Sequence, residues 1–281
     1  MAGVNAQPGV VLVVSDVDGT LLDPQKQLGA GVLAAARALK QAGIRFTIAS
    51  ARPPRLTLPL LRDLHVTEPS ACFNGALLID PAGNVLHQLP MASGDAQTVA
   101  NYIRRSPLDL WVYTGSDWFV SNPTGPHVRP QEMLMGCQAT PLPTYDMLQF
   151  HVLKMVGVSD DYGAVKTAQA ELAAAPRIRI SATRSSEYYV DVTHAGADKG
   201  AVVLALSKML SIPTRYIATI GDMNTDVLMF RKSGVSIAMG NATDDVKAQA
   251  MYVTKSNTED GFAFAMENFI LGGAYRQVAA D

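Results

Sequence analysis

The strongest constraint on the fold is a short apolar run that ends in two aspartates. Residues Val10–Val14 are typical of a buried strand, and Asp16 and Asp18 follow it just before Gly19. In an extended chain residues i and i+2 point to the same side, so these carboxylates would lie close together. Their repulsion favours a cation between them, and carboxylate oxygens suit Mg²⁺. A solvated polar turn is the alternative interpretation.

Strand-like and helix-like segments alternate in the first and last thirds of the chain, whereas the middle third has another pattern. This alternation predicts a doubly wound, Rossmann-like parallel sheet of the α/β class. The middle third holds most of the aromatic residues and pairs of adjacent strand candidates, which is typical of an α+β domain. We expect a discontinuous core, 1–88 and 192–281, with a cap domain inserted at 89–191. Residues 122–148 lack a clear periodicity, and no structure is predicted for them.

Charge and hydropathy narrow the classes of function. The chain has 23 basic and 25 acidic residues and no Lys/Arg-rich run, which argues against nucleic-acid binding and a polybasic membrane anchor. No segment approaches the roughly 20 apolar residues of a membrane helix, and the first residues lack the basic start of a signal peptide. We expect a cytoplasmic protein, monomeric or homodimeric, with a small molecule as its partner and neither nucleic acid nor membrane.

Polar side chains follow each predicted core strand where the strand ends. The carboxyl ends of parallel strands meet at one edge of a sheet, and sites form there. The side chains expected at this edge are Asp16, Asp18, Thr20, Ser50, Arg52, Asn74, Lys199, Asp222, Asp226 and Asn241. Phosphoryl transfer needs a metal and fixed donors around the transferred group, so this set of residues favours that chemistry.

The same residue types predict roles in the reaction. Asp16 leaves the strand first and is the expected nucleophile, forming an aspartyl-phosphate. Asp18 would protonate the leaving oxygen and then activate water. Ser50 and Lys199 would bind the phosphoryl oxygens, the hydroxyl as a donor and the ammonium as a point charge. Arg52 has two interpretations, a phosphate or gating residue and a surface charge.

A second acidic pair completes the expected metal site. Asp222 and Asp226 are four residues apart at a predicted helix start, so they lie one turn apart on one face. Together with Asp16 they would form a Mg²⁺ cage. Acids at a helix start are also favoured by the helix dipole alone, which is the alternative interpretation.

The segments that carry these residues resemble the motifs of the haloacid dehalogenase superfamily. They are DVDGTLL, Ser50 in IASAR, Lys199 in ADKG, and GDMNTD, in that order along the chain. The segment Met239–Gly261 resembles the C-terminal signature of the Cof-type branch, the subclass IIB phosphatases. The resemblance implies a Mg²⁺-dependent phosphatase whose inserted α/β cap closes over the substrate.

The resemblance also implies a role for each residue. Asp16 matches the nucleophile, and Asp18 matches the general acid/base whose backbone carbonyl is a metal ligand. The remaining matches are phosphate binding for Ser50 and Lys199, the acidic metal pair for Asp222 and Asp226, and site-lining positions for Asn74 and Asn241. One position departs from the family pattern, because Thr225 stands where Asn is common. Loss of a group that orients metal ligands can weaken metal binding by about tenfold.

The leading hypothesis is a Mg²⁺-dependent phosphatase of small phosphorylated metabolites, with sugar phosphates the first class to test. A phosphomutase or phosphotransferase of the same superfamily is the first alternative, in which the aspartyl-phosphate passes to a sugar hydroxyl. A phospho-ligand-binding protein with weak or no turnover is the second. Transfer to an added acceptor would favour the former, and ligand-induced stabilisation without phosphate release would favour the latter.

Overall fold

The parallel sheet expected from the alternating pattern is present in the computed structural model, which describes residues 9–272. Five parallel strands lie in the order β14-β13-β12-β1-β2. Their bounds are β1 (Leu12–Ser15), β2 (Arg45–Ile48), β12 (Ile217–Gly221), β13 (Val235–Ala238) and β14 (Tyr252–Val253). Because β1 lies between β2 and β12, its carboxyl end is adjacent to the ends of both neighbours.

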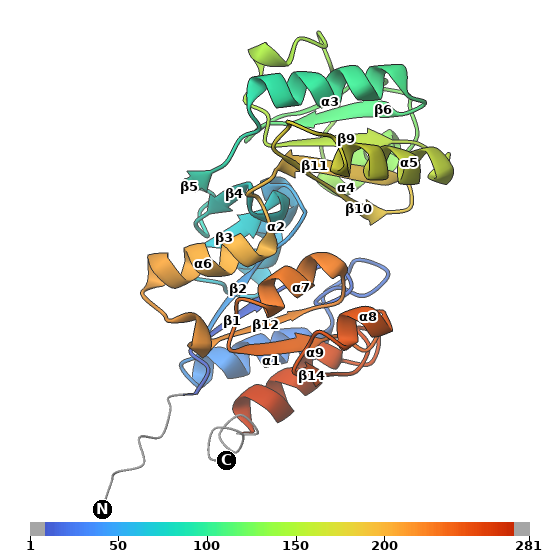
Figure 1. Ribbon diagram of the computed structural model, residues 1–281. Coiled ribbons are helices and arrows are strands. Elements are labelled where there is room, and N and C mark those ends of the chain that lie inside the picture. Colours follow the sequence, from blue (N-terminus) through green and yellow to red (C-terminus); the bar gives the residue numbers. More distant parts are fainter. Residues whose placement is uncertain (1–8, 273–281) are drawn as a thin grey trace, which may run out of the picture.

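Side chains of β1 pack alternately against two layers of helices. Val13 belongs to a hydrophobic cluster with α1 and α9, whereas Leu12 and Val14 belong to one with α6 and α7. The sheet is therefore covered on both faces, as Figure 1 shows, and this explains the continuous apolar run. The core helices are α1 (Ala30–Gln41), α2 (Pro54–Asp63), α6 (Lys199–Leu210), α7 (Asn224–Phe230), α8 (Asp244–Lys247) and α9 (Gly261–Ala265), which continues as the π-helix η4 (Met266–Leu271).

A small antiparallel sheet extends the core beyond β2. It consists of β3 (Ser70–Cys72), β4 (Leu77–Ile79) and β5 (Val85–Gln88), and a parallel bridge between Ala49 and Ala71 connects it to the end of β2. The 3-10 turn η1 (Phe73–Gly75) follows β3 and holds Asn74 at a φ of 56°. This left-handed conformation is uncommon for a residue other than glycine, and it places Asn74 at the edge where β1 and β2 end.

The second body, here called the cap, is a six-stranded sheet with strand order β10-β11-β9-β6-β7-β8. Figure 1 shows it above the core, with α3 and α5 on its outer side. Its strands are β6 (Asp109–Tyr113), β7 (Trp118–Val120), β8 (Thr140–Pro141), β9 (Lys154–Val158), β10 (Ile180–Ser186) and β11 (Tyr189–His194). Its helices are α3 (Ser93–Arg105), α4 (Val128–Met135) and α5 (Tyr162–Ala173), with 3-10 turns η2 (Met147–Gln149) in the cap and η3 (Thr214–Tyr216) in the core.

Alternation along β6 separates the two faces of the cap sheet. Leu110 and Val112 pack with α3 and α5, whereas Trp111 and Tyr113 belong to the hydrophobic cluster that continues into the core. Tyr113 lies with its ring centroid 5.6 Å from that of Phe73, which follows β3 of the core. The inner face of the cap therefore carries Trp111 and Tyr113, and it faces the edge where the core strands end.

Sequence patterns predicted most elements but not the centre of the cap sheet. No strand was expected at β9, although all of its residues are buried and it pairs with both β6 and β11. Strand β11 continues to His194, so residues 192–194, which the expected division assigns to the core, lie in the cap sheet. The division of the chain into domains stays a prediction.

Candidate active site

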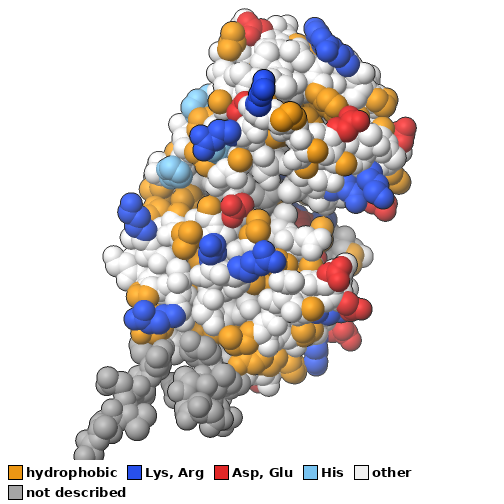
Figure 2. Space-filling model, in the orientation of Figure 1, with side chains coloured by type: hydrophobic (Ala, Val, Ile, Leu, Met, Phe, Trp, Pro, Cys, Tyr) orange, Lys and Arg blue, Asp and Glu red, His pale blue; other side chains and the backbone are white. Residues whose placement is uncertain are grey.

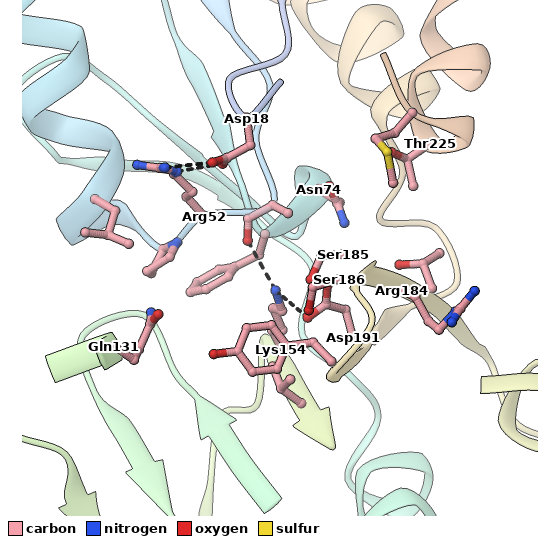
Figure 3. A pocket seen from close by; sticks show the side chains of 18 of the residues that line it. Asp18, Arg52, Asn74, Gln131, Lys154, Arg184, Ser185, Ser186, Asp191 and Thr225 are labelled. Carbon is pink, nitrogen blue, oxygen red and sulfur yellow. Dashed lines mark hydrogen bonds and ion pairs between the residues drawn. The ribbon is translucent and has the colours of Figure 1, made fainter. Parts of the chain in front are cut away.

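The carboxyl ends of β1, β2 and β12 open into a cavity of about 490 Å³ between the core and the cap. Figure 2 shows a notch between the two bodies, and Figure 3 shows side chains of both bodies pointing into the cavity. The expected site residues that line it are Asp16, Asp18, Arg52, Asn74, Lys199 and Asp222. The cap supplies, among others, Trp111, Tyr113, Gln131, Lys154, Tyr189 and Asp191.

Lys199 lies between two buried carboxylates at the base of this cavity. Helix α6 begins at Lys199, where the side chain of the preceding Asp198 accepts a hydrogen bond from the Ala201 backbone N–H. The ammonium contacts Asp16 Oδ1 and lies 2.5 Å from Asp226 Oδ1. Burial alone would lower the pKa of Lys199, but the two carboxylates outweigh it and raise the pKa above its usual value. Lys199 is therefore a permanent ammonium.

Asp226 is held in place from its other side. It lies in the first turn of α7 and is fully buried. Its Oδ2 accepts hydrogen bonds from the backbone N–H groups of Asp222 and Met223, both at 2.9 Å. These bonds fix the loop after β12. Asp222 lies in this loop, before the first residue of α7, so the two acids are not one helical turn apart as predicted, although their oxygens lie close together.

Three carboxylates gather within reach of one cation. Oxygens of Asp16, Asp222 and Asp226 lie within 4.8 Å of one another. Burial raises the pKa of Asp16 well above its usual value, and the attraction of Lys199 only partly offsets burial and the neighbouring acids. Burial and the charge of Asp226 raise the pKa of Asp222 to about 7. A divalent cation would relieve this excess of negative charge, so the residues fit a Mg²⁺ ion.

Asp18 is held by two cations rather than by the acidic cluster. Arg52 donates to both of its oxygens, from Nε and Nη2 at 2.7 Å each, and Lys26 Nζ lies 2.7 Å from Oδ1. Burial would raise the pKa of Asp18, but the hydrogen bonds and charges of Arg52 and Lys26 lower it to about 2. Asp18 is thus an ionised carboxylate here. To carry a proton it has to lose some of its contacts with Arg52 and Lys26.

Two further expected residues, Thr20 after β1 and Ser50 after β2, form hydrogen bonds behind the cavity wall. Ser50 is buried, its Oγ accepts a hydrogen bond from the Arg52 backbone N–H at 3.1 Å, and its backbone oxygen accepts one from the Asn74 N–H at 2.8 Å. Thr20 Oγ1 donates to Asp222 Oδ1 at 3.4 Å. Ser50 and Thr20 therefore lie directly behind side chains that line the cavity.

Asn241 does not line the cavity itself but bonds to Gly19 and Asp222, which do. Its Nδ2 donates to the Gly19 backbone oxygen at 2.9 Å and to Asp222 Oδ2 at 3.3 Å. Its Oδ1 accepts a hydrogen bond from the Asn257 backbone N–H at 3.0 Å. The loop after β13 thus runs beside the loop after β1, and Asn241 binds the protein itself. Its position suits holding two site loops together.

Sequence reasoning missed several residues of the cavity wall. Lys26, on the loop after β1, contacts Asp18, and Lys154 and Asp191 form a buried ion pair at 2.8 Å in the cap. Asp191 lies in the segment Asp191–Thr193, which also resembles the Cof-type branch, but no role was predicted for it, and β9, which carries Lys154, was not predicted. Thr225 also lines the cavity, next to the acidic cluster.

Known proteins of one family resemble this chain over nearly its whole length. A sequence model of the haloacid dehalogenase-like hydrolase family matches residues 13–266. A putative phosphatase of Haemophilus influenzae is 25% identical over 91% of this chain and 96% of its own length. The Bacillus subtilis 5-amino-6-(5-phospho-D-ribitylamino)uracil phosphatase YwtE is 25% identical, covering 92% of this chain and 98% of its own.

A solved structure shows the same fold over nearly the whole chain. It is a haloacid dehalogenase-like hydrolase from Bacteroides thetaiotaomicron, 25% identical, with a TM-score of 0.81 over 92% of this chain and 99% of its own. These matches confirm the resemblance carried by the four sequence motifs and by the doubly wound core with its inserted cap. The chain belongs to the family of haloacid dehalogenase-like hydrolases.

Proposed function

We propose that this protein is a Mg²⁺-dependent phosphatase of small phosphorylated metabolites that works through an aspartyl-phosphate. The observation that carries the proposal is the buried cluster of Asp16, Lys199 and Asp226 at the base of a cavity closed by the cap. A phosphoryl group is an anion, so a site for it has to combine a nucleophile with fixed positive charge.

The reaction divides into two displacements at phosphorus. Asp16 attacks the phosphoryl group, a P–O bond to Asp16 forms, and the ester P–O bond breaks. Asp18, once protonated, supplies the proton that the leaving alkoxide needs. Asp18 then takes a proton from the water that attacks the aspartyl-phosphate, which regenerates Asp16 and releases inorganic phosphate. The charge of Lys199 stabilises the phosphoryl oxygens.

Asp16, Asp222, Asp226 and the backbone carbonyl of Asp18 would hold the metal ion. When bound, Mg²⁺ would supply positive charge that stabilises the phosphoryl oxygens during transfer. The raised pKa of Asp16 and Asp222 supports this assignment, because burial and the neighbouring acids outweigh the positive charge of Lys199 at both carboxylates.

The cavity favours a small leaving group. Its volume of about 490 Å³ is that of a small-molecule site, and the cap covers it with aromatic and polar side chains. The curated relatives include a phosphatase named for a phosphorylated ribitylamino compound, which is a small molecule of this kind. Sugar phosphates are the first class to test. Phosphoproteins fit poorly beneath an inserted cap.

Two further expectations stay predictions. No helix within residues 9–272 is long and apolar enough to cross a membrane. The cytoplasmic location and the monomeric or homodimeric state are expected from the sequence and need separate measurement.

The experiment is phosphate release from a panel of phosphorylated metabolites, with Mg²⁺ and with EDTA. We expect release with Mg²⁺ that EDTA abolishes, and the ranking of the esters would define the substrate class. If the folded protein releases phosphate from no ester but transfers it to an added sugar, the phosphotransferase alternative is correct. If it is only stabilised by phosphorylated ligands, it is a binding protein.

A further inference from the structure

A buried ion pair lies in the cap wall of the cavity, opposite the catalytic carboxylates. Lys154 begins β9 and Asp191 lies in the neighbouring β11, and Figure 3 shows both side chains at the cavity. Lys154 is 7% exposed and Asp191 is 2% exposed. Lys154 Nζ lies 2.8 Å from Asp191 Oδ1. The mechanism above uses neither residue.

The hydrogen-bonding capacity of this pair is not filled. Neither carboxylate oxygen of Asp191 accepts a hydrogen bond of normal geometry from any residue in the described part of the chain. The Lys154 ammonium has three donors, of which one reaches the Ala51 backbone oxygen at 3.3 Å and another faces Asp191. Buried charges are costly unless their remaining hydrogen bonds are made, so the pair needs a further polar partner.

That partner has to enter from the cavity, which both residues line. On one side, Lys154 reaches Ala51, which lies between Ser50 and Arg52 in the loop at the phosphoryl end of the site. On the other side, Tyr113 and Tyr189 of the cap line the same cavity. A group bound by the pair would therefore belong to the part of the substrate that lies between the phosphoryl group and the cap.

We propose that Lys154 and Asp191 bind a hydroxyl group of the leaving group. The ammonium donates to the hydroxyl oxygen, and the carboxylate accepts the hydroxyl proton. A hydroxyl both donates and accepts, so it fits such a pair, whereas an ether or carbonyl cannot donate to Asp191 and an ammonium cannot accept from Lys154. This inference rests on the proposed function, and it narrows the substrate class to phosphate esters of polyols and sugars.

The test compares esters with the same carbon skeleton, with and without hydroxyls. The pairs are glycerol 1-phosphate with propyl phosphate and sorbitol 6-phosphate with hexyl phosphate. In the wild type we expect kcat/KM to favour the polyol ester at least tenfold in one or both pairs, because an unmet buried donor and acceptor discriminate against the analogue that lacks the hydroxyl.

Two variants assign that preference to the ion pair. Lys154→Met should lower the ratio of polyol to alkyl kcat/KM at least about tenfold. The double variant Lys154→Met/Asp191→Leu removes both charges together, which keeps the test informative if Lys154→Met alone leaves an unpaired buried carboxylate and unfolds. Lys166→Met replaces an exposed lysine of α5 in the same cap and should leave the ratio unchanged.

The outcomes separate the inference from the proposed function. A wild type without preference in either pair, or variants that lower the rates of both esters equally, would overturn the inference. The second result would mean that Lys154 only ties the cap to the Ala51 loop. Phosphate release from none of the four esters or any other ester in the panel would refute the proposed function, and the inference with it.

Discussion

Replacing Lys199 with methionine tests the electrostatic account of the site most severely. In the structure the ammonium contacts Asp16 and Asp226, and all three residues are at most 5% exposed. Methionine fills a similar volume but leaves both carboxylates buried without their cation. Removing one member of a buried pair costs about 3–5 kcal/mol. Protonation of a carboxylate relieves part of this, so we expect a loss of about 3 kcal/mol in the free energy of unfolding at pH 7.5.

The sign of the pH dependence follows from the same contacts. Burial already raises the pKa of Asp16, and loss of Lys199 would raise it further. A carboxyl whose pKa is higher in the folded than in the unfolded state stabilises the fold below its unfolded pKa and loses that effect as the pH rises through its folded pKa. The deficit of Lys199→Met should therefore shrink between pH 7.5 and pH 5.5.

Urea unfolding in EDTA, at both pH values, measures these differences. A double-mutant cycle with Asp16→Asn is the control, because removing the charge of Asp16 should raise the stability of Lys199→Met more than that of the wild type, in which Lys199 partly offsets that charge. Equal stability of Lys199→Met and wild type at pH 7.5, or a deficit independent of pH, would show that Lys199 does not balance the charge of these carboxylates.

Three further predictions concern the acidic cluster and its loops. In EDTA, the free energy of unfolding of the wild type should rise as the pH falls from about 7.5 to about 5, because the pKa of Asp222 is raised to about 7 and that of Asp16 is raised too. Asp222→Asn should weaken this rise. If the dependence on pH is the same in Asp222→Asn, Asp222 is not its source. Thr225→Asn should tighten Mg²⁺ binding by about tenfold in metal-dependent thermal shifts, and equal or weaker binding would reject the role given to Thr225. Asn241→Ala should lower the free energy of unfolding by about 1 kcal/mol through its lost hydrogen bonds. An unchanged free energy of unfolding in urea would mean that these bonds do not stabilise the two loops.

The catalytic edge of the core was predictable because local pattern and topology agree there. The apolar run before Asp16 and Asp18 predicts a buried strand, whichever elements pack against it. A parallel sheet then brings the carboxyl ends of its strands together. The prediction that Asp222 and Asp226 lie close together was reached through a helical spacing, whereas in the structure Asp222 precedes α7 and the Asp226 carboxylate holds its backbone N–H. These inferences need no knowledge of which side chains pack together.

Contacts between distant segments were not predictable in the same way. The contacts of Lys26 and Arg52 with Asp18, and the bonds from Asn241 to the loop after β1, depend on how loops from distant parts of the chain pack together. Strand β9 begins with a lysine and contains a glycine, so its pattern is weak. Its burial becomes evident only when β6 and β11 are in place on either side.

The most direct test of the central claim is to trap the phosphorylated enzyme. Wild type and Asp16→Asn are mixed with a good substrate and Mg²⁺, quenched in acid, digested, and analysed by mass spectrometry. The account predicts one added phosphoryl group on Asp16 of the wild type and none in Asp16→Asn, which should be folded and lack turnover. A phosphoryl group on another residue, or release of phosphate by Asp16→Asn at the wild-type rate, would contradict it.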